Sequence, residues 1–229
     1  SGGNYNVVVG DEAGTALTTG DNNTFVGYAS GDATDDGSDN VAIGHQALSA
    51  NAGDDNVAIG KDALLVNIKN QNIAIGSHAL DSDVNGGTSV AIGHNALQAQ
   101  APATATDMYN VAVGNGAGQA VTTGVQNTLV GSLAGDAITT GYYNTALGKD
   151  ALTTNTLSSL NVAIGHSALK TMSAGNAETH NVAVGASAGL SVTTGTFNTL
   201  IGGLAGDAIT TGIRNTAVGQ QSFSTNTTG

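Results

Sequence analysis

A short repeat constrains the fold of this chain more than any other feature of its sequence. The unit reads Asn, a β-branched residue, usually Ala, then Ile, Val or Leu, and then Gly, and most units begin 16 or 17 residues apart. Two longer steps span 21 and 20 residues. The units begin at Asn6, Asn23, Asn40, Asn56, Asn72, Ser89, Asn110, Asn127, Asn144, Asn161, Asn181, Asn198 and Asn215. Thirteen matches at near-constant spacing predict a repeat architecture in which each unit stacks on its neighbours.

The residues of the unit favour a β-strand followed by a tight corner. The second position is Val, Thr or Ile in every unit, which favours strands. The closing glycines, including Gly44, Gly60, Gly131, Gly148 and Gly165, are suited to a corner with positive φ or close backbone approach. We therefore predict an all-β, parallel β-roll (a β-solenoid) of about thirteen coils of 16–17 residues. The chain is read as one repeat domain, 1–229, with blocks 6–109 and 110–180 and a partial block 181–229.

The coils are of two kinds. Four residues after the unit glycine stands either Leu, as in Leu48 and Leu152, or Gly, as in Gly31 and Gly135. The third position of the unit is larger than Ala at Val8, Phe25, Leu129 and Leu200, and the last three fall in the second Gly coil of each pair. We expect these bulky residues to fill space left by the glycines. The Ala at this position elsewhere is expected to allow close approach of a neighbouring chain.

The recurring asparagines predict an internal ladder in which each side-chain amide bonds to the next coil, as in stacked parallel strands. The members singled out are Asn23, Asn40, Asn56, Asn72, Asn127, Asn144, Asn161 and Asn198. The alternative is that each Asn only tolerates a left-handed turn. The two longer units are expected to bulge as loops near 99–107, which contains Pro102, and near 173–180.

Charge and composition exclude several classes of function. The chain carries 17 Asp and Glu against 5 Lys and Arg, a net charge of −12, which would repel nucleic acid and anionic membrane surfaces. No apolar run is long enough to insert in a membrane, and no signal peptide opens the sequence. The chain has no Cys, so its stability is expected to come from stacking and association. Because the repeat is under way by Asn6, we expect a segment of a longer fibre.

A search for chemistry finds no catalytic residues and no cofactor-binding motif. Four carboxylates, Asp32, Asp35, Asp36 and Asp39, cluster around Gly37 and could hold Ca²⁺. We prefer the interpretation that these four carboxylates form an acidic corner exposed to solvent and do not bind an ion. His45, His94 and His166 share one repeat position but sit in coils that do not adjoin, which favours a solvated column over a metal site.

The unit Asn-Val-Ala-Ile-Gly-x-x-Ala, as in residues 40–47 and 161–168, resembles the head repeat of trimeric autotransporter adhesins of the YadA type. The form that ends in Asn-Thr-Thr-Gly, at 226–229, is similar to repeats of tail-fibre-like surface proteins. The coils here are longer than the usual adhesin unit. The resemblance implies a left-handed β-roll, a homotrimer and an extracellular location on a cell or virion surface.

Three functions remain open at this point. The first is a structural or adhesive fibre segment, not an enzyme, that attaches to a host-cell surface glycan or protein or presents a binding tip. The second is a tailspike-like enzyme that degrades polysaccharide. The third is an ice-binding solenoid, which the interrupted Thr-Thr-Gly segments disfavour.

Overall fold

The computed structural model describes residues 3–228 and divides into two compact units, Ser1–Asn110 and Val111–Gly229. Each unit is a parallel β-solenoid, and residues 3–228 contain no helix. The prediction of an all-β parallel solenoid is thereby confirmed. The division falls where the first sequence block ends. Nothing in the described part of the chain is a helix that could cross a bilayer.

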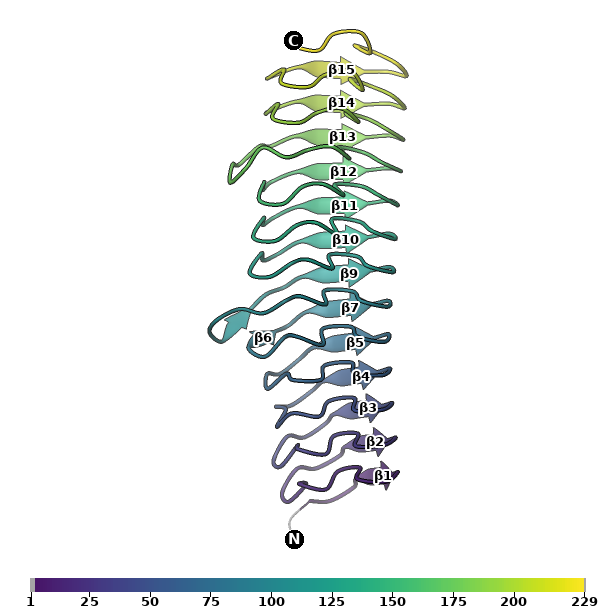
Figure 1. Cartoon of the computed structure of the whole chain (residues 1–229), viewed down its shortest axis with the longest axis vertical. Helices are drawn as coiled ribbons and strands as arrows, with labels where there is room; N and C mark the ends of the chain where they lie inside the picture. Colours follow the sequence, from purple (N-terminus) through teal and green to yellow (C-terminus); the bar gives the residue numbers. More distant parts are fainter. Residues whose placement is uncertain (1–2, 229) are drawn as a thin grey trace. The chain divides into compact units, whose positions relative to one another are not determined.

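Every predicted strand position forms a three-residue strand, and the strands of a unit pair in parallel in chain order (Figure 1). The strands of the first unit are β1 (Val7–Val9), β2 (Thr24–Val26), β3 (Val41–Ile43), β4 (Val57–Ile59), β5 (Ile73–Ile75) and β7 (Val90–Ile92). Those of the second are β9 (Val111–Val113), β10 (Thr128–Val130), β11 (Thr145–Leu147), β12 (Val162–Ile164), β13 (Val182–Val184), β14 (Thr199–Ile201) and β15 (Thr216–Val218). Equivalent repeat positions are always partners, as in Val41 with Val57, so the repeat sets the register.

The middle residue of each strand points into the coil. Ala58 and Leu129 have no exposed surface there, and only Val8 in β1 departs from this pattern with 43% exposure. The first and third residues face outward and are partly exposed. The expectation that Ala permits approach of another chain is therefore wrong. Its small side chain is needed because the interior of the narrow coil is already filled by Leu or by other inward side chains.

The unit glycine is required by both conformation and space. Gly60 has a φ of +132°, and a Cβ at this residue would lie 2.7 Å from the carbonyl carbon and oxygen of Gly76 in the next coil. The same contact recurs from coil to coil in both units. The glycines of the Thr-Thr-Gly segments differ, since Gly20 does not have positive φ. A Cβ on Gly20 would instead meet the Gly37 carbonyl oxygen of the next coil.

The two kinds of coil share one backbone. The fourth residue after the unit glycine is left-handed whether it is Leu80, with a φ of 51°, or Gly135, with a φ of 57°. Leu80 is completely buried, and this burial offsets the strain of a left-handed non-glycine residue. In the Gly coils the interior is filled from the strand instead. A Cβ on Gly31 would lie 2.7 Å from the Phe25 ring, which confirms that the bulky residues fill space left by the glycines.

The predicted asparagine ladder is present. The backbone N–H of Asn56 donates to Asn40 Oδ1 at 2.9 Å, and its Nδ2 donates to the carbonyl of Lys69 in the next coil at 2.8 Å. The pattern repeats through each unit, including Ser89, whose N–H donates to Asn72 Oδ1. Left-handed φ belongs to the residue before the asparagine, such as Asp55 or Gln71. The asparagines therefore form the predicted ladder. The alternative, that each Asn only tolerates a left-handed turn, is wrong.

The two long units bulge where the sequence placed them, but both bulges are ordered by pairing. In the first unit, β6 (Gly86–Gly87) pairs in parallel with β8 (Thr106–Asp107) and projects from the coils (Figure 1). In the second unit, Ser159 forms an isolated parallel bridge with Glu178. Each bulge thus pairs with the preceding coil, through a strand in the first unit and through a single bridge in the second.

Candidate functional site

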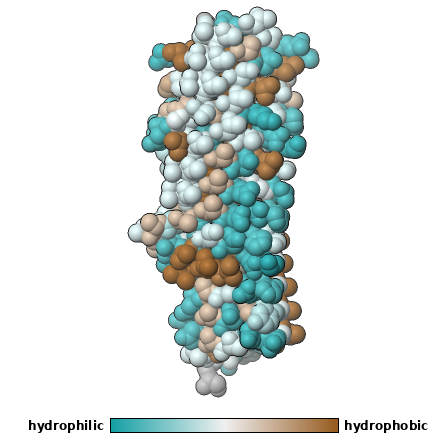
Figure 2. Space-filling view, in the orientation of Figure 1, coloured by the Kyte–Doolittle hydropathy of each residue, from teal (hydrophilic) through white to brown (hydrophobic). Residues whose placement is uncertain are grey.

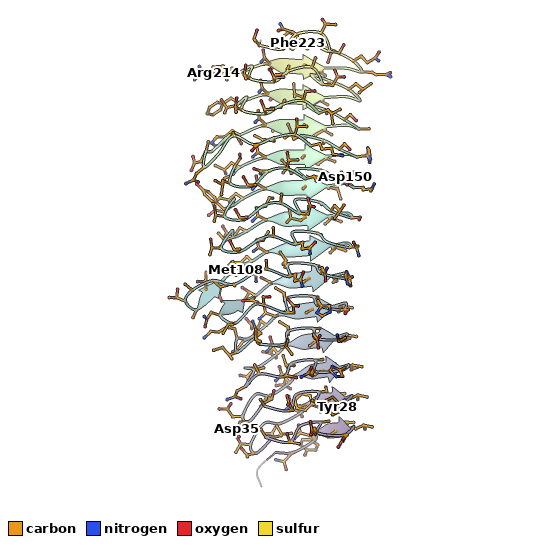
Figure 3. The ribbon with its side chains drawn as sticks, viewed as in Figure 1. Tyr28, Asp35, Met108, Asp150, Arg214 and Phe223 are labelled. Atoms are coloured by element: carbon orange, nitrogen blue, oxygen red, sulfur yellow. The ribbon has the colours of Figure 1, made fainter. Side chains whose placement is uncertain are left out.

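Charged and polar side chains are most frequent at the corner that follows each strand. Figure 3 shows Tyr28 at this corner of the first unit and Asp35 at the opposite corner. The tight turn after the unit glycine places the next residue outward and the second residue in left-handed conformation, as at Asp62 (φ 57°) and His78 (φ 59°). Successive coils therefore bring corner side chains of different repeat positions into contact.

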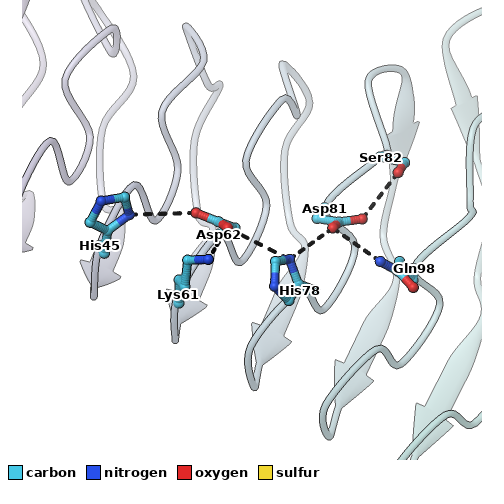
Figure 4. Close-up of polar contacts among 7 residues, drawn as sticks. All are labelled: His45, Lys61, Asp62, His78, Asp81, Ser82 and Gln98. Carbon is cyan, nitrogen blue, oxygen red and sulfur yellow. Dashed lines mark hydrogen bonds and ion pairs between the residues drawn. The ribbon is translucent and has the colours of Figure 1, made fainter.

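A histidine–carboxylate ladder runs along this corner in the first unit (Figure 4). Asp62 is its centre, with His45 Nδ1 3.6 Å from its Oδ1 and His78 Nδ1 3.6 Å from its Oδ2. Lys61 Nζ lies 3.3 Å from Asp62 Oδ2. The ladder continues through Asp81, whose Oδ2 lies 3.1 Å from His78 Nδ1. We define the ladder as His45, Lys61, Asp62, His78, Asp81, Ser82 and Gln98, the seven residues drawn in Figure 4.

Aromatic contacts connect both histidines of the histidine–carboxylate ladder to further rings. Tyr28 stacks on His45 with ring centroids 5.2 Å apart, and His78 meets His94 edge to face at 6.2 Å. A hydrogen bond to Glu12, together with the charge of that carboxylate, raises the pKa of Tyr28 above its ordinary value. His45 and His94 do not touch each other, as the sequence indicated. The repeat positions gave no sign that Asp62 and His78 would connect the coils between them.

The ladder is suited to electrostatic cohesion between coils. Its hydroxyl group, Ser82, donates to Asp81 Oδ1 at 3.0 Å and so does not form a nucleophile–base pair with a histidine of the ladder. Asp62 is nearly buried, and its Oδ1 has no hydrogen-bond partner among the described residues. Lys61 supplies positive charge to this carboxylate, and the Nδ1 atoms of His45 and His78 face its two oxygens.

The second unit has a smaller counterpart at the same corner. Lys149 Nζ and Lys170 Nζ lie 3.6 and 3.5 Å from Asp150 Oδ2. Burial raises the pKa of the nearby Asp136, and hydrogen bonds from its own N–H and that of Ala137 act in the opposite direction. Among residues 3–228, one buried oxygen of Asp136 has no hydrogen-bond partner, and the same holds for one oxygen each of Asp32 and Asp207 at equivalent repeat positions. His166 lies exposed at this corner.

The four residues considered for Ca²⁺ differ in their surroundings. The Asp35 N–H donates to Asn51 Oδ1 at 2.9 Å and its carboxylate accepts from Thr18. The Asp39 N–H donates to the Asp21 carbonyl, and Asp39 is the left-handed residue before Asn40. Asp36 is exposed, and Asp32 keeps its unpartnered oxygen. Across residues 3–228, no three His, Asp or Glu side chains are grouped so that they could hold a metal ion.

An aromatic and cationic group lies at the opposite corner of the second unit. His180 stacks on Phe197 with ring centroids 5.2 Å apart, and the Arg214 guanidinium lies 5.7 Å from the Phe197 centroid. These three residues immediately precede successive ladder positions, which places them one coil apart. Nearby, the Tyr142 hydroxyl donates to Glu178 at 2.9 Å, and this hydrogen bond raises the pKa of Tyr142.

A row of aliphatic residues follows the third position of the strands on their outer face. The third strand residue is aliphatic in all thirteen strands, and examples remain 38% (Ile43), 46% (Leu147) and 40% (Ile201) exposed. Figure 2 shows hydrophobic residues in a row along one edge of the first unit. No charged residue interrupts the first or third strand position. A repeated, uncharged and partly exposed aliphatic face is typical of a surface that packs against another protein surface.

No pocket is found in the part of the chain that the structure describes. A comparison with models of protein families, with curated proteins and with solved structures finds no match to this chain in any of the three.

Proposed function

We propose that the chain is a structural and adhesive segment of an extracellular fibre, on a cell or virion surface, and that it assembles as a homotrimer. The observation that carries the proposal is the aliphatic outer face of the strands. Each coil contributes two outward strand residues, and exposure of such a face to water is unfavourable by about 25 cal/mol per Å². Packing of the strand faces of three copies against one another removes this surface from water.

The internal bonding also supports a load-bearing role. Within each unit, successive coils are joined by parallel strand pairing and by the asparagine ladder, as in Asn198 and Asn215 at 3.0 Å. Adhesion in such a fibre comes from exposed corners that repeat along it and make weak, multivalent contacts with a host glycan or protein. The trimer and the surface location also agree with the resemblance of the repeat to YadA-type heads and tail-fibre-like proteins.

Sedimentation equilibrium tests the assembly. The wild-type chain should sediment at three times its mass of 22.3 kDa. The double variant Ile59→Lys, Ile75→Lys places two charges on the outer strand face and should sediment as a folded monomer, with an unchanged circular dichroism spectrum. Ile68→Lys is the matched control, because Ile68 is 41% exposed but lies outside the strands. A wild-type monomer would refute the trimer, and a monomeric control variant would refute the assignment of the interface.

Adhesion needs its own measurement. Binding of the purified wild-type trimer to glycan arrays and to whole cells should exceed that of the monomeric double variant by more than the threefold change in valency. Equal binding per chain would contradict multivalent attachment. Steady release of sugar products from a polysaccharide would instead favour the enzyme alternative. For ice binding, the structure offers an argument against, since Thr122 and Thr139 donate their hydroxyl groups to carbonyls of the next coil.

A further inference from the structure

Asp83 is a carboxyl group in the interior of the solenoid. It stands seven residues after its unit glycine, Gly76, and the residue at this position is buried in most of the other coils. Equivalent residues are uncharged, for example Thr34 and Val121, both fully buried. Asp83 has no exposed surface either. An ionised carboxylate in such a place is costly unless a cation compensates for the lost hydration.

No cation does so. Within residues 3–228, no lysine, arginine or histidine forms an ion pair with Asp83. The charged or titratable groups on the surrounding elements are His78 and Asp81, which pair with each other at the outer corner of the same coil. Lys69 and Asp107 lie near Gly87, next to the segment that Asp83 holds.

The hydrogen bonds of Asp83 connect it to the projecting β6–β8 pair. Its Oδ1 accepts from the Gly86 N–H at 2.7 Å, at the start of β6. Its Oδ2 accepts from Gln100 Nε2 at 2.7 Å, just before the loop that leads to β8. Gln100 Oε1 in turn accepts from Asn110 Nδ2 at 2.9 Å. The buried carboxyl group of Asp83 therefore connects both ends of the β6–β8 bulge to the asparagine ladder.

We name residues 84–87 and 101–107 the flap. The Gly86 carbonyl accepts from Nδ2 of Asn67 and of Asn72 at 2.9 and 3.0 Å, so opening of the flap must break these bonds as well. The Thr106 N–H donates to the Asn85 carbonyl at 3.1 Å, and the Met108 N–H donates to the Gly87 carbonyl at 3.0 Å. Ala101, Ala103, Thr104 and Ala105 are exposed. Because Asp83 has no exposed surface and its Oδ1 accepts from the Gly86 N–H, displacement of Gly86 would uncover the carboxyl group.

We propose that Asp83 is a proton-operated latch, which holds the flap against the coils when its carboxyl group is protonated and releases it when the group ionises. The latch does not depend on the oligomeric state, since it lies inside one chain. It would release the flap in neutral surroundings and so expose Pro102, which is buried in the closed form, and it would dock the flap in acidic surroundings.

The direction of the pH effect follows from the pKa of the Asp83 carboxyl group in the closed form and in the open form. Burial raises the pKa of Asp83 from 3.8 to about 6 in the closed form, and the hydrogen bonds from Gln100 and Gly86 act in the opposite direction. The open form has the ordinary pKa, so the closed form binds more protons between these two values. Opening therefore becomes easier as the pH rises, by roughly 50-fold between pH 4 and pH 8.

Amide hydrogen exchange measures the latch. The protection of the Gly86, Thr106 and Met108 amides, corrected for intrinsic exchange, should fall roughly 50-fold between pH 4 and pH 8. The Gly60 amide, which donates to the Ile43 carbonyl, is the reference and should change little. In Asp83→Thr, which copies the residue of the second coil, the flap should lose this pH dependence. The control Asp107→Asn removes a flap carboxylate outside the coil and should keep it.

Two results would overturn the proposal. One is equal pH dependence of the flap and of the reference amide in the wild type. The other is an Asp83→Thr variant that keeps the full change. If that variant fails to fold, a carboxyl NMR titration of the wild type replaces it, and titration of Asp83 without a parallel change at Gly86 and Met108 would refute the latch.

Discussion

Gly135 lies directly against the side chain of Leu129, so that a Cβ built on Gly135 would come 2.8 Å from Leu129 Cδ2. The next coil solves the same packing problem in reverse, with Ala146 in the strand and Leu152 at the left-handed position, both fully buried. We predict that Leu129→Ala lowers the free energy of unfolding by about 2–5 kcal/mol, and that Gly135→Leu alone also destabilises. The double variant should recover much of the loss, because it converts one kind of coil into the other. Urea midpoints would measure this coupling, and strictly additive losses would contradict it.

Gly60 and Gly175 separate conformational strain from steric clash. Both have positive φ, but a Cβ on Gly60 meets the backbone of Gly76 at 2.7 Å, whereas a Cβ on Gly175 has nothing within 4 Å. We expect Gly175→Ala to lower the free energy of unfolding by about 1 kcal/mol. Gly60→Ala should lower it by well over that amount or prevent folding. Thermal melts of the two variants give the comparison, and equal losses would show that the coil-to-coil contact is not limiting.

A substitution at Asn144 tests the contribution of the asparagine ladder to stability. The Oδ1 of Asn144 accepts from the Asn161 N–H at 3.1 Å, and its Nδ2 donates to the Ser158 carbonyl at 3.0 Å. Asn144→Ala leaves the buried Asn161 N–H without this acceptor, while the Ser158 carbonyl keeps its bond from Asn155 Nδ2. We therefore predict a loss of about 1–3 kcal/mol in unfolding free energy. Asn176→Ala, at an exposed residue of the same unit, is the control and should change it by less than about 0.5 kcal/mol. A comparable loss in both variants would argue against the ladder as a source of stability.

Asp62 is the common partner in the histidine–carboxylate ladder. Asp62→Asn keeps the shape of the side chain and removes the negative charge of the carboxylate that Lys61, His45 and His78 face. Because those partners are largely solvated, we expect a loss of only about 0.5–1 kcal/mol in the free energy of unfolding at low salt. The loss should shrink as salt is added, since screening weakens the wild-type contacts. Denaturation at two ionic strengths measures it, and a loss that salt does not alter would contradict an electrostatic origin.

Asp136 predicts a pH dependence in the second unit. Its pKa is raised in the folded chain, chiefly by burial. The folded state therefore binds more protons than the unfolded state, and this contribution to stability is lost as the pH rises from the ordinary carboxyl pKa through the raised one. Asp136→Asn should remove that loss between pH 3.5 and pH 7. Glu178→Gln makes the same charge change on an exposed side chain and should keep it. Parallel pH profiles of the wild type and Asp136→Asn would contradict the assignment.

The fold could be predicted because the repeat encodes it locally. A β-branched residue, a small residue and a glycine at fixed spacing determine the strand, the interior and the corner of each coil, and Phe25 and Gly31 even revealed their mutual packing. The contacts at the corners could not be predicted in this way. His78 lies one repeat position away from His45, yet both meet Asp62, because the left-handed corner residue turns toward the preceding coil. The role of the Ala positions was also misjudged, since a strand with two apolar faces does not by itself show which face is inside.

The shared left-handed position of Leu80 and Gly135 has a genetic consequence. Because both kinds of coil have the same backbone and the same ladder connection, one coil can precede or follow another without rebuilding either. Recombination between the DNA segments that encode these near-identical coils would add or delete whole coils while each junction stays well packed. The number of coils in a lineage would then change in single steps, and selection could adjust it without the invention of new sequence.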